Sequence, residues 1–159
     1  IQKGFFLNEI YINYGPGNSC DIETKFKKLE LLADDFSLED AKKDGNYVMD
    51  GEKIYNKKSY DDFMTNVRAK IPSTLRIVTT NTDGDILITD LEYLSNGKYM
   101  VYYDGTRDRN QKNHQSIIAY KFEHMKVYKN KLYVYNGDEL VIKKAKKYET
   151  YYLLTLPQD

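Results

Sequence analysis

The sequence predicts an α+β fold, in which N-terminal helices pack on one face of a mostly antiparallel sheet of about five to seven strands. Before Pro72, apolar residues recur with the helical period of about 3.6, and after Pro72 they recur with a period of about two. Asp-Gly and Asn-Gly pairs separate the later apolar runs, which is typical of tight hairpins. Helices are therefore expected early in the chain and strands late.

The size of the chain fits one domain, because it has 159 residues. We expect residues 1–36 to form a flank of one strand and one helix, and residues 37–159 to form the α+β core. Hydrophobic residues make up 41% of the chain and include 16 Tyr and 6 Phe, which supply a large core. Cys20 is the only cysteine, so an intramolecular disulfide is excluded.

The first elements are predicted from β propensity and from capping residues. Phe5 to Tyr14 is apolar and β-prone, and Ser19 or Asp21 can cap the helix that is expected to follow. Ser37 to Asp40 then resembles a capping box, which predicts a short helix that ends near Gly45.

The clearest helical pattern lies at residues 57–70. Asn56 is the expected N-cap, and Pro72 ends the segment. The apolar side chains of this segment recur at i, i+3, i+4 and i+7, and they are Tyr60, Phe63, Met64 and Val67.

Strands joined by tight turns are predicted for the rest of the chain. The expected strands lie at residues 75–79, 86–93, 99–103, 116–128, 132–135, 140–142 and 148–156. The turns between them carry Gly, Asn or Asp, as in Asp83-Gly84, Asn96-Gly97 and Asn136-Gly137. Many tyrosines fall on these strands, so an outward sheet face could bind a protein, a peptide or a glycan.

The charge balance argues against nucleic acid as a partner. The 24 basic and 24 acidic side chains cancel, so no global field draws the chain to a polyanion. Lys and Tyr side chains alternate in groups at residues 143–152, as they do in some nucleic-acid-binding proteins. The favoured interpretation is an edge strand that its Lys residues protect from pairing with another chain. Arg binds a carboxylate or phosphate with two parallel hydrogen bonds and therefore better than Lys does. Arg occurs at only four positions, and each is of interest: Arg68, Arg76, Arg107 and Arg109.

The densest polar loop begins at Asp104 and follows a predicted strand directly. Its carboxylates flank an Arg and could bind a polar ligand or the charge of a partner. We take Asp104, Arg107, Asp108, Arg109 and His114 as candidate partner-binding residues. In the alternative interpretation, Asp104 and Asp108 cap the turn and pair with Arg107, so that the loop is purely structural.

Metal and catalytic sites are not expected. Asn81, Asp83 and Asp85 place oxygens at alternate positions, as calcium ligands do, but a hairpin turn explains the same residues and the distal Glu of a calcium loop is missing. The sequence contains no phosphate-binding loop and no Gly-x-Ser-x-Gly nucleophile motif, so no cofactor is predicted. The catalytic alternative is a small hydrolase that uses Asp104, Asp108 and His114 in a pocket.

Between about Leu38 and Ile118 the chain contains a series of short motifs in a characteristic order. They are Gly45-Asn46-Tyr47-Val48, Gly51, Ile54-Tyr55-Asn56, Phe63, Val67, Arg76-Ile77, Thr82, Gly84-Asp85, Asp90-Leu91, Tyr93, Tyr103-Asp104 and Asp108. In this order they resemble a family of small domains of unknown function, found in secreted proteins and lipoproteins of Gram-positive bacteria. The chain departs from the family at Ile86, where Pro is frequent, and it lacks the paired cysteines of the family's C-terminal half.

The resemblance implies an extracytoplasmic location, with a signal or lipid anchor upstream of Ile1 as the only link to a membrane. It implies no known activity. The leading hypothesis is therefore a non-catalytic binding module of a cell-surface or secreted protein, with a protein or cell-wall partner. The alternatives are the hydrolase and an intracellular regulatory or immunity-type protein.

Overall fold

The structure is a computed structural model, and it describes residues 28–29, 31–109, 117–144 and 149–158. Within these residues the fold is α+β, with one sheet of six strands and one sheet of three. The strand predicted at residues 5–14 and most of the helix predicted after it lie outside the described residues.

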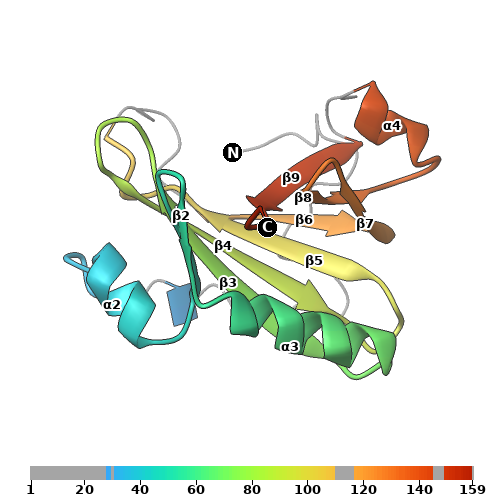
Figure 1. The fold of residues 1–159 in the computed structure, drawn as a ribbon, viewed down its shortest axis with the longest axis horizontal. Helices are drawn as coiled ribbons and strands as arrows, with labels where there is room; N and C mark the ends of the chain where they lie inside the picture. The colour runs from blue at the N-terminus through green and yellow to red at the C-terminus, as the bar shows by residue number, and fades with distance from the viewer. Residues whose placement is uncertain (1–27, 30, 110–116, 145–148, 159) are drawn as a thin grey trace.

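The elements follow one another as labelled in Figure 1. The helices are α2 (Leu38–Lys43), α3 (Lys57–Arg68) and α4 (Leu140–Lys143). The six-stranded sheet contains β1 (Tyr47–Asp50), β2 (Lys53–Tyr55), β3 (Ser73–Thr80), β4 (Ile86–Tyr93), β5 (Tyr99–Asp104) and β6 (Ile117–Phe122). The small sheet contains β7 (His124–Tyr128), β8 (Lys131–Tyr135) and β9 (Thr150–Thr155).

Helix α2 begins with the predicted capping box. The Ser37 hydroxyl accepts from the backbone N–H of Asp40 at 3.1 Å, and the Asp40 carboxylate accepts from the backbone N–H of Ser37 at 3.0 Å. These bonds hold the pKa of Asp40 below its ordinary value, and they satisfy two N–H groups that a helix start leaves free.

Asn56 precedes α3 as predicted, but it does not cap the helix with its side chain. Its backbone is left-handed, with a φ of 62°, and its amide donates to the carbonyls of Lys42 and Asn46 at 2.9 and 2.8 Å. Asn tolerates this conformation better than most residues. Asn56 therefore ties the start of α3 to the turn between α2 and β1.

The six-stranded sheet has the order β2-β1-β3-β4-β5-β6. Neighbouring strands are antiparallel except β1 and β3, which are parallel, so the expected mostly antiparallel sheet is confirmed. Strand β1 pairs with β3 only from Ile77 onwards, so among the described strands none pairs with Ser73 to Arg76 on that side.

Hydrophobic clusters cover both faces of the large sheet. On one face, Leu75 and Ile77 pack with Phe63 of α3 and with Leu132 and Leu154 of the small sheet. On the other face, Val48, Val78 and Ile88 pack with Ala41 of α2 and with Leu29. The expectation that the helices pack on one face is therefore wrong, because the apolar residues alternate to both sides of β3 and each side needs a cover.

The predicted strand at residues 116–128 is two strands that belong to different sheets. The break falls at Glu123, whose backbone N–H donates to the Asn136 side chain at 2.9 Å. The expected strand at residues 140–142 is also wrong, because these residues form α4. Asp138 accepts from the backbone N–H of Leu140 at 2.9 Å, and Val141 and Ile142 pack on Tyr135.

Candidate functional site

The polar loop after β5 lies beside the turn between β3 and β4, and we call residues 81–85 and 104–109 together the loop clamp. Asp104 ends β5 and is almost fully buried. Its carboxylate accepts from the backbone N–H and the hydroxyl of Thr106, at 3.0 and 2.6 Å. Its other oxygen accepts from Arg107 Nη1 at 3.1 Å. Asp104 thus folds the loop back onto the end of the strand.

Arg107 carries this interaction across to a distant part of the chain. Its Nη2 donates to the backbone carbonyls of Leu32 and Ala33, at 3.3 and 3.1 Å. Only 15% of its side chain is exposed. Its Nε is buried and has no hydrogen-bond partner among the described residues, so little of this guanidinium is accessible to a partner molecule. Arg107 therefore fastens the segment before α2 over the large sheet.

The second half of the loop clamp is centred on Asn81 and Asp85. The Asn81 carbonyl oxygen accepts from the backbone N–H groups of Asp83 and Asp85, both at 2.9 Å. Its amide donates to Asp108 at 3.1 Å, and so connects the turn to the other loop. Arg109 completes the contact, because its backbone N–H and its Nε donate to Asp85 at 3.1 and 2.8 Å.

These contacts make the ionised form of Asp85 favourable. The backbone N–H of Arg109 holds the pKa of Asp85 below its ordinary value, with further contributions from Asn81 and the Arg109 side chain. The oxygens of Asn81 and Asp85 are thus engaged by the turn itself. Within the described residues, no group of three or more His, Cys, Asp or Glu could hold a metal ion.

A close approach also shapes the loop clamp at Gly105. A Cβ on this residue would lie 2.7 Å from Cε2 of Tyr103, well inside ordinary contact. Burial raises the pKa of Tyr103, and the charges of Asp108 and Asp104 raise it further. A side chain at position 105 would therefore require the Tyr103 ring to move.

The predicted site residues differ sharply in accessibility. Asp104 and Asp108 are buried, Arg107 is largely buried, and 75% of the Arg109 side chain is exposed. His114 lies outside the described residues. The structure therefore brings Asp104 and Arg107 together as in the structural alternative, and Arg109 is the accessible one of the four candidate residues that it describes.

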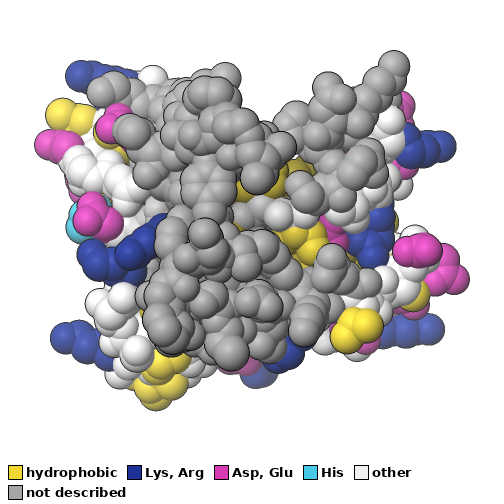
Figure 2. Space-filling model, turned by 180° about the vertical axis from the view of Figure 1, so that it is seen from behind, with side chains coloured by type: hydrophobic (Ala, Val, Ile, Leu, Met, Phe, Trp, Pro, Cys, Tyr) yellow, Lys and Arg dark blue, Asp and Glu magenta, His cyan; other side chains and the backbone are white. Residues whose placement is uncertain are grey.

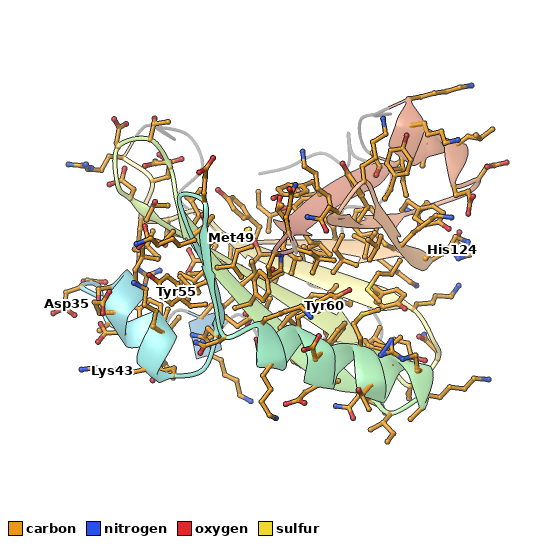
Figure 3. The ribbon with its side chains drawn as sticks, viewed as in Figure 1. Asp35, Lys43, Met49, Tyr55, Tyr60 and His124 are labelled. Atoms are coloured by element: carbon orange, nitrogen blue, oxygen red, sulfur yellow. The ribbon has the colours of Figure 1, made fainter. Side chains whose placement is uncertain are left out.

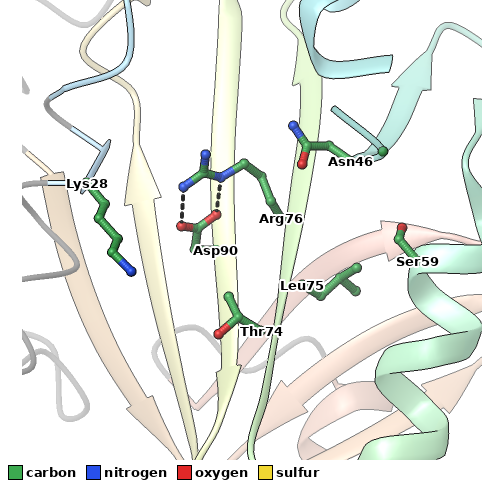
Figure 4. Close-up of a pocket in the computed structure, with 8 residues that line it drawn as sticks. Lys28, Asn46, Ser59, Thr74, Leu75, Arg76 and Asp90 are labelled. Carbon is green, nitrogen blue, oxygen red and sulfur yellow. Dashed lines mark hydrogen bonds and ion pairs between the residues drawn. The ribbon is translucent and has the colours of Figure 1, made fainter. Parts of the chain in front are cut away.

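A cavity of about 420 Å³ opens elsewhere, where β1 stops short of the first residues of β3. Figure 4 shows the side chains that line it. Its polar lining comes from Lys28, Asn46, Ser59, Thr74, Arg76 and Asp90. This volume falls within the usual range for sites of small ligands.

An ion pair between neighbouring strands forms one wall of the cavity. Arg76 of β3 and Asp90 of β4 are directly opposite in the strand register. Arg76 donates to Asp90 from Nε at 2.7 Å and from Nη2 at 2.8 Å. Asp90 is 4% exposed and Arg76 is 23% exposed, so the pair reaches water through the guanidinium. These bonds hold the pKa of Arg76 above its ordinary value.

Sequence reasoning identified Arg76 as one of four arginines of interest but did not combine it with Asp90 or Lys28. A signal was present, because both Arg76 and Asp90 interrupt otherwise apolar or β-prone runs. Their pairing depends on the register of the β3–β4 hairpin, and the position of Lys28 depends on tertiary contacts.

Two further observations concern the distribution of charge on the surface and the position of His124. In the view of Figure 2, the basic and acidic side chains of the described residues are interspersed around the rim. His124 lies on the small sheet beside Tyr135, with ring centres 5.1 Å apart, and it is far from the β3–β4 turn (Figures 1 and 3).

None of the helices in the described part of the chain combines the length and the hydropathy that a membrane-spanning helix requires. Comparison of the chain with models of protein families, with curated proteins and with solved structures finds no match.

Proposed function

We propose that this chain is a non-catalytic, extracytoplasmic binding module of a bacterial cell-surface or secreted protein, and that the loop clamp presents its partner-binding surface. The observation that carries the proposal is the state of Arg109. Three quarters of its side chain is exposed, yet its Nε is held at 2.8 Å by the carboxylate of Asp85.

Such an arrangement suits recognition because the loop is ordered before a partner arrives. Asp85 also holds the backbone of Arg109, and Arg107 holds the loop from behind. A preordered loop loses less conformational freedom on binding. Arg is enriched among the residues that dominate binding energy, so Arg109 is the expected anchor for an acidic group of a protein or a cell-wall polymer.

The extracytoplasmic location rests on the family resemblance of the motifs from Gly45 to Asp108. The hydrolase alternative gains no support from the geometry of Asp104 and Asp108. Both carboxylates are buried and accept hydrogen bonds from within the loop clamp. The cavity beside Arg76 is lined by other side chains.

Co-sedimentation with purified Gram-positive cell walls, together with capture from a cell-surface extract, tests this function. Arg109→Ala should weaken the interaction at least about tenfold and leave folding unchanged. Lys53→Ala is the matched control, since Lys53 is an exposed cation on β2 outside the loop clamp. Equal binding by wild type and Arg109→Ala, or no binding to either material, would contradict the proposal.

A further inference from the structure

The cavity beside Arg76 contains hydrogen-bond donors that the described residues leave unused. Arg76 uses Nε and Nη2 for Asp90, and its Nη1 makes no bond to the residues drawn in Figure 4. Within the described part of the chain, neither the ammonium of Lys28 nor the side-chain amide of Asn46 has a hydrogen-bond partner. All three groups line the same cavity.

The free edge of Arg76 has a definite shape. A guanidinium carries five N–H donors in one plane, and two parallel donors along one edge match the two oxygens of a carboxylate. Asp90 occupies the edge formed by Nε and Nη2. The edge between Nη1 and Nη2 therefore remains for a second planar acceptor, and Asp90 holds the guanidinium in a fixed orientation for it.

The charges that line the cavity favour a ligand with a single negative charge. Among the lining side chains Lys28 and Arg76 are cationic and Asp90 is anionic, and the charges of Asp44 and Asp104 also act on Arg76. With this much negative charge already present, a doubly charged phosphate is less favourable than a monoanion.

The surroundings also leave room for the rest of a small molecule. Gly45 lies at the border of the cavity, and a Cβ placed on it would meet no atom of the described residues within 4 Å. Ser59 and Thr74 add hydroxyl groups to the wall, and none of the described strands pairs with Ser73 to Arg76 on this side.

We propose that this cavity binds a small carboxylate. Arg76 and Lys28 would bind the carboxylate group, and Asn46 would donate a further hydrogen bond. A free amino acid derivative and the carboxyl end of a short peptide share this chemistry. The site is separate from the loop clamp, so Arg109→Ala should leave carboxylate binding unchanged. Failure of one proposal is therefore distinguishable from failure of the other.

Titration of the isotope-labelled chain with N-acetyl-alanine, followed by NMR at constant ionic strength, tests the site. We expect saturable shifts of the backbone amides of Asn46, Thr74 and Arg76. N-acetyl-alanine amide should bind at least tenfold more weakly, and inorganic phosphate should bind more weakly than N-acetyl-alanine. Extending the acid to a tripeptide with a free carboxyl end shows whether a peptide source is preferred.

Two variants connect the shifts to the named groups. Lys28→Ala should weaken binding of N-acetyl-alanine at least threefold, and Arg76→Lys should weaken it at least tenfold because Lys lacks the planar fork. Lys53→Ala should bind as wild type does. Equal affinity for the acid and its amide, tighter binding of phosphate, or an unchanged affinity in Lys28→Ala would overturn the proposal. Because Lys28 is exposed, its variant tests the site even where Arg76→Lys is unstable.

Discussion

The loop clamp and the Arg76 cavity both contain arginine–carboxylate pairs, but they use them differently. In the loop clamp, Arg107 is enclosed by Asp104 and by the carbonyls of Leu32 and Ala33. In the cavity, Arg76 is held by Asp90 on one edge and is open on the other. The two arginines therefore differ in accessibility: Arg107 is enclosed by its own chain, whereas the outer edge of Arg76 faces a cavity that a ligand can enter.

The two regions are connected through Arg107. Arg107 holds the carbonyls of Leu32 and Ala33, and Lys28, a lining residue of the cavity, lies four residues before Leu32 in the sequence. The loop that appeared most functional in the sequence thus supports the structure around a site that the sequence did not reveal. Of the candidate residues of that loop that the structure describes, Arg109 is the one whose side chain is largely exposed to a large partner.

The largest expected effect is on stability, in the loop clamp. Arg107→Ala leaves the buried carboxylate of Asp104 without its cation and removes the donor to two carbonyls. We predict a loss of about 3–5 kcal/mol in the free energy of unfolding, measured by urea denaturation. Arg109→Ala, on the exposed side of the same loops, should cost less than about 1 kcal/mol. Similar losses of unfolding free energy in the two variants would show that the buried Arg107 does not stabilise the fold more than the exposed Arg109 does.

The Arg76–Asp90 pair should respond more mildly because water reaches the guanidinium. Asp90→Ala should lower the free energy of unfolding by about 2 kcal/mol, since Arg76 is left partly buried without its partner. The double variant with Arg76→Met should recover part of this loss, because no unpaired charge remains. If the double variant instead lost as much unfolding free energy as the two single variants added together, Arg76 and Asp90 would not be coupled to each other.

A steric test applies to the loop clamp alone. Gly105→Ala should cost about 1–2 kcal/mol in unfolding free energy, because its Cβ would meet the Tyr103 ring at 2.7 Å. In a Tyr103→Ala background the same change should be nearly neutral, and a double-mutant cycle measures this coupling. Additive effects would show that the ring does not limit the loop.

The smallest effect is a pH dependence. The pKa of Asp85 is lowered in the folded chain, chiefly by the backbone N–H of Arg109, so its stabilisation is present above the ordinary value of 3.8. This stabilisation is lost as the pH falls below that value. Asp85→Asn should therefore show a shallower acid loss in urea titrations than wild type. Asp40→Asn should also make the acid loss of unfolding free energy shallower, and the two effects should add. A steeper acid loss in Asp85→Asn than in wild type would contradict the role of Asp85.

Local patterns predicted local structure well. The apolar spacing of Tyr60 and Phe63 indicated the buried face of α3, and Ser37 and Asp40 formed the expected capping box. Asp83-Gly84 and Asn96-Gly97 both lie between paired antiparallel strands. These features depend on residues close together in sequence, so a single chain contains the information that they need.

Features that depend on distant contacts were not predictable. The alternation across residues 116–128 gives no sign of the break at Glu123, which depends on a hydrogen bond to Asn136. The same holds for the site, since Arg76 meets Asp90 through the strand register and Lys28 through the packing of a remote segment. The internal bonds of Asp104 were anticipated only as one of two alternatives.

The division between structural and ligand-binding charges is tested most directly by urea unfolding of wild type and Lys28→Ala, each with and without saturating N-acetyl-alanine. Without ligand we predict the same midpoint for both proteins, because Lys28 is exposed and unpaired within the described residues. With ligand the midpoint of wild type should rise, and that of Lys28→Ala should rise clearly less, since a ligand stabilises only the state that it binds. A lower midpoint for Lys28→Ala without ligand, or an equal rise in both proteins, would contradict this division.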